Sequence, residues 1–421
     1  MTRTSASSIL SPAPLQAPTP KAKARTSPAA APAEEAANSS RLTLPAYEKI
    51  ALVLQGGGAL GSYQAGVVEG LLEAGIEPDW VAGISIGALN SAIIAGNPPE
   101  KRLEALKGFW STICQPAYLP PFMGALGPQI TALSQPARKW LSMVAASRAM
   151  FEGQKGFFVP KRPDFGFGPA KPTPADVSLY DTSLLKETLL QFADFDRINN
   201  GGMRVSLGAV NVATGNFVYF DNTKIVLRPE HFMASGALPP SFPAVEIDGE
   251  YYYDGGLVSN TPLSEVLGAL QHQDTLVFQV DLWSAAGSLP TDLTGVSERI
   301  KDIQYSSRTR MVTDVMEEFQ RNALLVKELL ALIPDEAKAG NKWVAKGEEV
   351  ADSGVANIIH LIYQHKAYES HVKDFEFSLD TMNEHWLSGV NDVRNSLAKP
   401  HWLDIPKTLS GFVTHDIHRS D

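Results

Sequence analysis

Residues 50–61 read Ile50-Ala51-Leu52-Val53-Leu54-Gln55-Gly56-Gly57-Gly58-Ala59-Leu60-Gly61. The continuous apolar residues before the first glycine predict a strand that is covered on both faces, as in a parallel sheet. The adjacent glycines allow positive φ angles and leave backbone N–H groups free to bind a negative oxygen. The stretch therefore predicts a buried strand that ends in an anion-binding turn. The anion is either a bound phosphate or the transient oxyanion of an ester under attack.

Helices and strands alternate after this turn. Residues 62–74 carry apolar side chains on one face and predict a helix, residues 79–84 predict a second strand, and residues 85–95 predict a buried helix. The order strand, helix, strand, helix predicts an α/β fold with a parallel sheet.

The composition is that of an ordinary globular protein, with 44% hydrophobic and 19% charged residues. The formal charge of −10 argues against a general nucleic-acid binder, which needs a basic face to neutralise phosphates. The single cysteine, Cys114, excludes an internal disulfide, fits a reducing compartment and is expected as a small buried residue. No stretch reaches the roughly 18 apolar residues of a spanning helix. We therefore expect a cytoplasmic protein that contacts membranes, if at all, at their periphery.

Shifts in composition divide the chain into three parts. Residues 1–44 are rich in Ala, Pro and Ser, and their prolines forbid a continuous helix, so we expect a disordered tail. The lack of acidic residues early in this tail would also suit a transit peptide, but the prolines weaken the amphipathic helix that such a peptide needs. Residues 48–285 are expected to form the main domain, and residues 290–421 a mostly helical C-terminal extension.

Apolar patterning continues into the second half of the chain. It predicts strands at 203–212, 276–282 and 355–363 and a last helix over 381–397. It also predicts one long amphipathic helix over 297–333, ended by Pro334, with covering the sheet as its expected role.

The segment 151–178 is a long Pro- and Gly-rich loop that contains several aromatic residues. They are Phe151, Phe157, Phe158, Phe165 and Phe167. Long loops inside compact domains are commonly functional, and the aromatic residues make this one a candidate lid or lipid contact. The alternative is an insertion whose Phe side chains only pack onto the core.

Gly83-Ile84-Ser85-Ile86-Gly87 places a serine between the second predicted strand and the helix after it. The glycines two residues to either side suit a turn so sharp that larger residues would clash, and such a turn exposes the serine oxygen above the sheet. We therefore interpret Ser85 as a nucleophile. The alternative is a tight turn in which Ser85 is an ordinary helix N-cap.

Gly56, Gly58 and Gly61 also fit the glycine spacing of a dinucleotide-binding turn. Such a site needs an acidic residue at the carboxyl end of the second strand, where it holds the ribose. Asp79 lies at the start of that strand, whereas its end carries Ser85. The oxyanion interpretation is therefore favoured.

A nucleophilic serine needs a base, and Asp254 is the preferred candidate. Tyr251-Tyr252-Tyr253 predicts an extended segment that delivers Asp254 onto a turn made by Gly255 and Gly256. A carboxylate is a weak base, so it must lie within hydrogen-bonding distance of the hydroxyl and be helped by oxyanion stabilisation. Taken alone, an Asp-Gly pair is more often a simple turn.

A conventional Ser-His-Asp triad is the alternative mechanism, and its base would be one of the histidines that follow Ser85. The candidates are His272, His360, His365, His371, His385 and His401, none of which has a distinctive sequence context. No spacing of His and carboxylate residues indicates a metal site, and no cofactor is implied.

Three segments together resemble the patatin-like phospholipase family. They are the glycine turn within 52–67, the serine motif within 83–90, and Tyr253-Asp254-Gly255-Gly256-Leu257-Val258-Ser259-Asn260-Thr261-Pro262, preceded by 234–239. The likeness covers roughly residues 50–285. It implies a mainly parallel central sheet sandwiched by helices and a Ser-Asp dyad that hydrolyses acyl esters of lipids without a histidine.

Carried over residue by residue, the resemblance makes Ser85 the nucleophile and Asp254 its base. It makes the turn from Gly56 to Gly61, with Gly57, Gly58 and Ala59 between them, the oxyanion hole. The motif glycines Gly83, Gly87, Gly255 and Gly256 shape the two turns. The implied partner is a lipid ester, and the oligomeric state is not indicated.

One position departs from the family pattern. Leu60 stands where the family commonly has Arg or Lys, which removes a positive charge beside the oxyanion turn. Backbone donation should survive this change, but a preference for anionic lipid headgroups is put in doubt. A non-catalytic lipid-binding or scaffold protein with a degenerate site is the remaining alternative.

Overall fold

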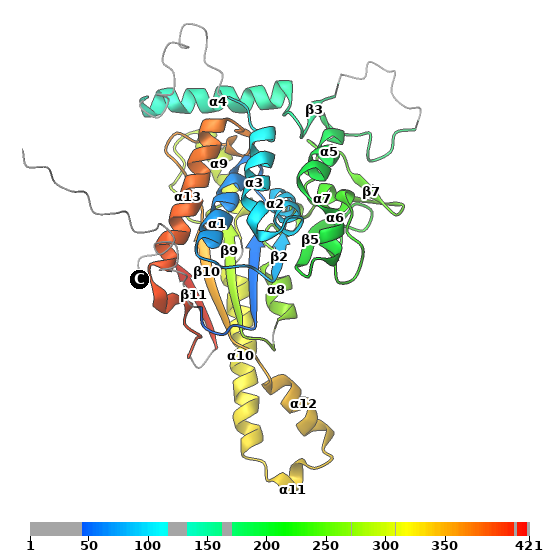
Figure 1. Cartoon of the computed structure of the whole chain (residues 1–421), viewed down its shortest axis with the longest axis vertical. Coiled ribbons are helices and arrows are strands. Elements are labelled where there is room, and N and C mark those ends of the chain that lie inside the picture. Colours follow the sequence, from blue (N-terminus) through cyan, green and yellow to red (C-terminus); the bar gives the residue numbers. More distant parts are fainter. Residues whose placement is uncertain are drawn as a thin grey trace, which may run out of the picture. The chain divides into compact units, whose positions relative to one another are not determined.

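The strand β1 (Lys49–Leu54) lies between two parallel neighbours, β2 (Trp80–Gly83) and β9 (Thr275–Asp281). Leu54 pairs with Gly83 on one side and with a residue of β9 on the other. The carboxyl ends of the three strands therefore reach the same edge of the sheet, at the end toward which β1 points in Figure 1. The last four residues of β1 are buried, as expected for a strand covered on both faces.

The computed structural model describes residues 44–116, 133–161, 171–270, 272–307, 309–407 and 411–418. These residues belong to one compact unit. The tail expected over 1–44 lies outside the described residues except for its last position.

The remaining strands of the described residues extend this mainly parallel sheet, except for β3 and β4. They are β3 (Val159–Pro160), β4 (Tyr180–Asp181), β5 (Arg204–Asn211), β6 (Phe217–Asp221), β7 (Val245–Ile247), β8 (Glu250–Asp254), β10 (Ala356–Ile362) and β11 (Phe412–Asp416). The order across the main sheet is β11, β10, β9, β1, β2, β5, β8, β7, and β6 also pairs with β5. From β11 to β5 all neighbours in this order are parallel, and β6, β7 and β8 add an antiparallel edge. β3 and β4 form a separate pair.

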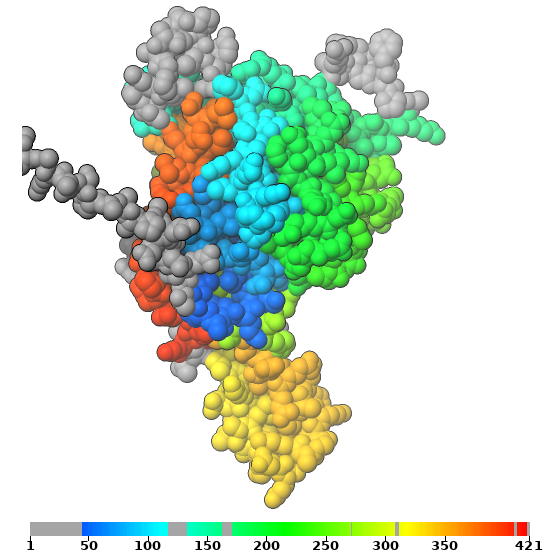
Figure 2. Space-filling model, in the orientation of Figure 1, coloured from blue at the N-terminus to red at the C-terminus, as the bar shows by residue number. Residues whose placement is uncertain are grey.

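Helices cover both faces of this sheet. The helices of the described residues are α1 (Ser62–Glu73), α2 (Ile86–Ala95), α3 (Pro99–Ile113), α4 (Gln135–Glu152), α5 (Ser183–Phe192), α6 (Phe195–Asn200), α7 (Pro229–Ser235), α8 (Leu263–Ala269), α9 (Leu293–Tyr305), α10 (Thr309–Ala331), α11 (Asp335–Lys338), α12 (Lys342–Ala351) and α13 (Leu379–Leu397), of which α11 and α12 lie away from the sheet (Figure 1). Short 3₁₀ turns lie at η2 (Gly58–Gly61), η5 (Gly255–Leu257), η6 (Lys373–Phe375) and η7 (Pro400–Leu403). In Figure 2, the atoms of α1, α3 and α13 cover the face of the sheet that is turned to the viewer.

Alternate side chains of β1 enter two different cores. Leu52 and Leu54 pack into the larger core with residues of α1, α2, α3 and α13. Ala51 and Val53 point to the other face, where they pack with buried residues of α8. This two-sided burial confirms the expected mainly parallel sheet with helices on both faces.

The C-terminal segment is part of the same sheet. The segment from residue 290 onward is largely helical, as expected, but its strands β10 and β11 extend the parallel sheet beyond β9. Its helix α13 lies against α1 so closely that a Cβ atom on Gly66 of α1 would come within 1.9 Å of the Trp386 carbonyl oxygen. The strands and α13 thus complete the sheet and cover one of its faces.

The expectation of a single helix over 297–333 is wrong. The chain forms two helices, α9 and α10, because Ser306 has an extended backbone, with φ −60° and ψ 146°. The Tyr305 carbonyl accepts a hydrogen bond of 2.8 Å from the Asn260 side chain. The Ser307 hydroxyl donates to the Asp281 carboxylate at the end of β9. The Tyr305 carbonyl, which a continuous helix would hold in its own ladder, thus bonds to Asn260, and the Ser307 side chain anchors the chain after the break.

We expect Gly389→Ala to destabilise the protein. A Cβ at this position of α13 would lie 2.2 Å from the Tyr63 carbonyl oxygen of α1, so the two helices would have to separate. The free energy of unfolding should fall by about 1–3 kcal/mol, measured by urea denaturation. The matched control is Gly268→Ala in α8, where nothing lies within 4 Å of the added methyl. The control should be neutral or gain up to about 1 kcal/mol from helix propensity. Equal stability of the two variants would contradict the close packing of α1 and α13.

Candidate active site

Ser85 occupies a strained turn between β2 and α2. Its φ of 55° and ψ of −123° are unusual for a residue other than glycine. A Cβ on Gly83 would lie 2.4 Å from the Gly87 carbonyl oxygen, and one on Gly87 would lie 2.4 Å from the Leu54 carbonyl oxygen. Any residue larger than glycine at position 83 or 87 would therefore clash with the backbone. Ser85 sits at the N-cap position of α2, but its side chain makes no capping hydrogen bond, so the N-cap alternative is not supported.

A second serine holds the backbone of this turn. The N–H of Ser85 donates to the Ser235 hydroxyl over 3.1 Å, and that hydroxyl donates to the Gly208 carbonyl over 2.7 Å. Ser235 ends α7, and Gly208 lies in the middle of β5. The resemblance included the segment 234–239 but gave Ser235 no role, because nothing local indicates that α7 reaches the turn.

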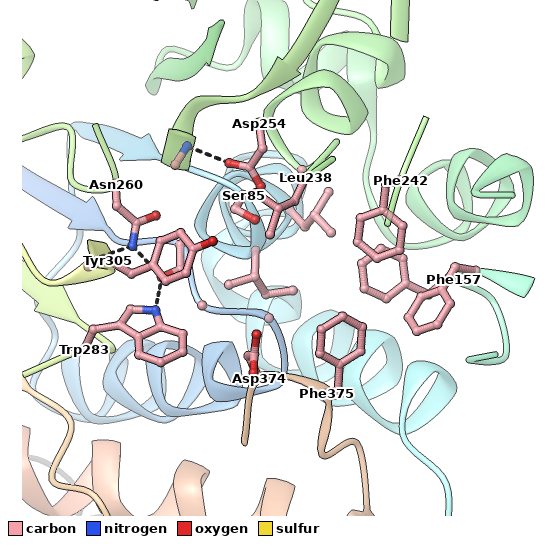
Figure 3. Close-up of a pocket in the computed structure, with 18 of the residues that line it drawn as sticks. Ser85, Phe157, Leu238, Phe242, Asp254, Asn260, Trp283, Tyr305, Asp374 and Phe375 are labelled. Carbon is pink, nitrogen blue, oxygen red and sulfur yellow. Dashed lines mark hydrogen bonds between the residues drawn. The ribbon is translucent and has the colours of Figure 1, made fainter. Parts of the chain in front are cut away.

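Asp254 is the last residue of β8 and is only 1% exposed. Its carboxylate accepts a hydrogen bond of 2.7 Å from the Gly256 N–H and has the Ser85 side chain beside it. Burial raises the pKa of Asp254 to about 7, against the smaller lowering effect of these two polar neighbours. Figure 3 shows the two side chains facing each other. The predicted nucleophile and base therefore lie together, although 169 residues separate them.

The turn after Asp254 is built for close contact. A Cβ on Gly255 would lie 2.6 Å from the Gly208 carbonyl oxygen of β5, so a larger residue would push β8 away. The Asp-Gly pair does form a turn, as the simpler interpretation of the sequence holds. The same turn also delivers the carboxylate to Ser85.

The glycine turn after β1 lines the cavity only through its first three residues, Gly56, Gly57 and Gly58. The Gly56 N–H donates to the Asn260 carbonyl over 3.2 Å, so it cannot also bind an oxyanion. Within the described residues, the N–H groups of Gly57 and Gly58 have no protein acceptor. Ala59 begins the buried part of η2 and does not line the cavity.

Gly61 and Leu60, at the end of the same turn, face the core. A Cβ on Gly61 would meet Ile86 at 2.5 Å, and Leu60 is fully buried. The predicted oxyanion residues therefore divide into two groups. Gly57 and Gly58 present free donors, whereas Gly56, Ala59 and Gly61 support the shape of the turn.

The carbonyl of Gly56 is also fixed. It accepts hydrogen bonds from the Asn260 side chain at 3.0 Å and from the Trp283 indole at 2.9 Å. The buried side chain of Gln55 accepts from the N–H groups of Leu282 and Trp283 at 2.6 and 2.9 Å. The end of β1 is thus tied to the end of β9, which prevents the glycine turn from changing its conformation.

The cavity beside Ser85 is narrow, with about 60 Å³ open to the centre of a water molecule. Its wall is mainly apolar, and Figure 3 shows aromatic rings on the side opposite Asn260. The aromatic residues of this wall are Phe157, Phe158, Phe242, Phe375 and Phe377. Such a wall suits an alkyl chain better than a charged ligand.

The candidate lid over 151–178 is described only in part. Phe157 and Phe158 are buried and line the cavity, while Phe151 is 83% exposed. Phe165 and Phe167 lie outside the described residues. Phe157 and Phe158 both pack onto the core and line the cavity, so they do not distinguish the two interpretations of this loop. The role of the loop as a lid stays a prediction.

Four cavity residues come from the C-terminal segment, and the sequence motifs gave no signal for them. They are Tyr305, Asp374, Phe375 and Phe377. A Cβ on Gly58 would lie 2.3 Å from the Asp374 carbonyl oxygen, so η6 presses directly on the glycine turn. The Asp374 carboxylate is held by Lys301 of α9 through hydrogen bonds of 2.7 and 2.9 Å.

The histidines considered for a triad lie elsewhere, and none of those described lines this cavity. His360 pairs with Asp281 at 2.7 Å, and His385 pairs with Glu369 at 2.6 Å. His365 contacts Glu298 and Glu369 at 3.1 and 3.0 Å. His272 contacts the carbonyl of Asp352, and His401 packs beside Trp402. His371 is partly buried and has no polar partner for its Nδ1 within the described residues.

Cys114 is buried, and burial raises the pKa of its thiol. Asp79 accepts a hydrogen bond of 2.8 Å from the Ile50 N–H at the start of β1, far from the carboxyl end where a ribose would bind. Within the described part of the chain, no group of three or more His, Cys, Asp or Glu residues could hold a metal ion. No described helix is long and apolar enough to cross a membrane.

Comparison with known proteins gives related sequences over half of the chain. A patatin-like phospholipase domain-containing protein of Caenorhabditis elegans is 27% identical over 214 residues, 51% of this chain and 12% of that protein. A lysophospholipase of Aspergillus terreus is 54% identical over 46 residues, 11% of this chain and 3% of that protein. The chain thus spans only a small part of the length of these relatives. VipD from Legionella pneumophila superposes with a TM-score of 0.36 and 14% identity, covering 87% of this chain and 72% of that one.

Two family models also match the chain. One, described as patatin phospholipase, matches residues 303–409. The other, described as patatin-like phospholipase, matches residues 52–267, more than half of the 421 residues. The matched ranges include Ser85, Asp254 and the C-terminal residues that line the cavity. The chain belongs to the patatin-like phospholipase family.

Proposed function

We propose that this protein is a serine hydrolase that cleaves acyl esters of lipids through a Ser-Asp dyad. The observation that carries the proposal is that the side chains of Ser85 and Asp254 face each other inside an apolar cavity. A serine hydroxyl is a weak nucleophile unless a base accepts its proton as it attacks. A carboxyl group with a pKa near 7 is suited to both accepting and returning a proton at neutral pH.

The reaction proceeds in two halves. The Ser85 oxygen attacks the ester carbonyl carbon while Asp254 accepts the hydroxyl proton, which gives a tetrahedral oxyanion. Collapse of this intermediate breaks the bond to the alcohol, which takes the proton from Asp254 as it leaves. Water then attacks the acyl-enzyme with Asp254 again as base, and the fatty acid departs while Ser85 regains its proton.

Backbone donors stabilise the negative charge in both halves. The free N–H groups of Gly57 and Gly58 line the cavity beside Ser85, and they are the donors that we assign to the oxyanion hole. Loss of a single donor of this kind typically costs about 10²–10³ in rate. The Asn260 and Trp283 contacts to Gly56 hold these donors in place before substrate binds.

The shape and polarity of the cavity indicate the substrate class. An acyl chain directed from Ser85 toward the aromatic wall would contact Phe157, Phe242 and Phe377. A lipid ester is therefore the proposed substrate, and the cytoplasm or a membrane surface the proposed place of action. The non-catalytic alternative, a lipid-binding or scaffold protein, would keep the cavity but not the chemistry.

We expect Ser85→Ala and Asp254→Asn each to lower kcat for ester hydrolysis by about 10³-fold or more, because each removes a group that takes part in bond making. The assay is hydrolysis of a soluble short-chain ester and of phospholipid in micelles. Asp248→Asn is the matched control, because Asp248 is exposed and pairs only with Arg228 on the surface. It should retain activity.

The folded variants His360→Ala and His365→Ala should also retain activity, because neither histidine lines the cavity. A folded but inactive histidine variant would favour a conventional triad.

A fluorophosphonate probe should label Ser85 covalently. Labelling reports an activated serine next to an oxyanion hole and does not depend on the identity of the lipid. Mass spectrometry of the labelled peptide should locate the adduct at Ser85, and Asp254→Asn should label at least tenfold more slowly by rough estimate. Absence of labelling in the folded wild type would support the non-catalytic alternative instead.

The value of kcat/KM should rise with pH around the pKa of Asp254. Only the ionised carboxylate can accept the serine proton, and its ionised fraction rises from about a tenth at pH 6 to about nine tenths at pH 8. The profile should be measured with a neutral ester whose own charge does not change. A flat profile across this range would contradict Asp254 as the base.

The same burial has a consequence for stability. The pKa of Asp254 is raised in the folded state from 3.8 to about 7, so this group lowers the stability of the protein as the pH rises through that interval. Asp254→Asn removes the buried charge and keeps an oxygen to accept from Gly256. Its melting temperature at pH 8 should therefore equal or exceed that of the wild type, which shows that lost activity does not reflect unfolding.

A further inference from the structure

The helix α9 turns its apolar residues toward the solvent. Leu293, Val296, Ile300 and Ile303 are 85%, 40%, 57% and 61% exposed. Their spacing of three, four and three residues places them on one face of the helix. No residue of α9 is buried. A surface helix of a globular protein normally shows the opposite arrangement, with its apolar stripe against the core.

The charged residues of α9 face the protein instead. The side chains of Glu298, Lys301 and Asp302 are only 18%, 29% and 17% exposed. Lys301 binds Asp374 at 2.7 Å, and Asp302 binds Lys373 at 2.9 Å. In the first pair α9 supplies the basic residue, and in the second pair η6 supplies it.

Further polar contacts join α9 to neighbouring segments. Glu298 contacts His365 at 3.1 Å, and the Arg299 guanidinium donates to the Ala285 carbonyl. The helix is therefore held in place by ion pairs and hydrogen bonds on its inner side. Its apolar face is left free to meet a partner.

This inverted helix lies at the active site. Its last residue, Tyr305, lines the cavity, and the Tyr305 ring packs against Trp283 with 5.4 Å between ring centroids. The Lys301 partner, Asp374, lines the same cavity next to Gly58. In Figure 1, α9 lies at the end of the sheet toward which β1 points, which is also the end that carries Ser85.

We propose that the outward face of α9, formed by Leu293, Val296, Ile300 and Ile303, inserts into a lipid surface and brings the mouth of the cavity to ester substrates held there. This inference rests on the proposed function, because an ester embedded in a lipid aggregate must reach Ser85 from that aggregate. Exposed apolar patches beside a catalytic cavity are typical of such contact. Because α9 ends at the cavity, a lipid surface bound to its outer face would lie close to the cavity that holds Ser85, which favours lipid over other partners.

Charge indicates how the contact is made. Both basic residues of α9 are engaged on its inner side, Lys301 with Asp374 and Arg299 with the Ala285 carbonyl, and the whole chain carries a formal charge of −10. Attraction to anionic headgroups therefore contributes little, unlike in helices whose polar face is rich in Lys and Arg. Binding should depend on apolar insertion, so zwitterionic vesicles should suffice and added salt should not release the protein.

The test compares Ile300→Ser/Ile303→Ser with a matched control, Leu329→Ser/Leu332→Ser. The control residues are 53% and 78% exposed, similar to Ile300 and Ile303, but Leu329 lies in the last turn of α10 and Leu332 directly after that helix. Each pair is placed in full-length protein that also carries Ser85→Ala, so that vesicles stay intact. Binding to phosphatidylcholine vesicles is measured by flotation. We expect the α9 variant to bind about tenfold more weakly or worse, and the control to bind like the parent.

A second assay separates this inference from the proposed function. With Ser85 restored, the α9 variant should hydrolyse a soluble short-chain ester at the wild-type rate and lose activity only on vesicles. Loss of activity on both substrates by a folded α9 variant would show a role inside the site and overturn the inference. A wild type that binds vesicles but cleaves no ester would refute the function and leave the surface in place.

Other outcomes overturn the proposal directly. Equal vesicle binding by the α9 variant and its parent, or no binding by the parent, would exclude α9 as a lipid contact. Release by salt would show an electrostatic contact made elsewhere. Light scattering that finds a dimer in the parent and a monomer in the α9 variant would identify a second copy of the chain as the partner of this face.

Discussion

The parallel pairing of β1 with β2 and β9 is the constraint on which the site depends. Because the three strands end at the same level, the glycine turn after Leu54, the serine turn after Gly83 and the Trp283 segment after β9 meet at one edge of the sheet. The buried Gln55 side chain then ties the first of these segments to the third. Such crowding is possible only without side chains at the crossing points. The glycines of the motifs are those crossing points, and a Cβ at Gly83 or Gly87 would overlap the backbone.

Burial of Asp254 has opposite effects on stability and on chemistry. Removing a carboxylate from water disfavours its charged form, which raises its pKa and weakens the folded state at high pH. The same shift brings the group to the pH range where it can exchange a proton with Ser85. The Gly256 N–H and the Ser85 hydroxyl limit the shift by stabilising the charge. Strain at Ser85 adds to the cost, as is common where a residue must project from a turn.

The C-terminal segment makes the site complete. η6 contacts Gly58, and Lys301 fixes the position of Asp374. Four residues of this segment form part of the cavity wall, namely Tyr305, Asp374, Phe375 and Phe377. The two family matches, over 52–267 and 303–409, therefore meet at one cavity. Because β10 and β11 extend the sheet that positions Ser85 and Asp254, loss of the C-terminal segment would expose one edge of β9 and remove the support of the glycine turn.

The local geometry of the three turns can be predicted from neighbouring residues in the chain. A buried strand before Gly56, the sharp turn at Ser85 and the turn after Asp254 follow from residue types within a few positions of one another, because backbone sterics are local. The family resemblance rested on the same motifs. The mainly parallel sheet followed from the alternation of helices and strands.

Contacts between distant parts of the chain determine which polar groups are left free at the site. The Gly56 N–H is used by Asn260, which is 204 residues away, so the donors of the turn are reduced to those of Gly57 and Gly58. The helix expected over 297–333 breaks at Ser306, because Asn260 and Asp281 take up the polar groups at the break. The apolar stripe of α9 was visible in the sequence, but its direction was not. Periodicity shows that a helix has two faces, whereas the ion pairs with η6 determine which face is turned to the solvent.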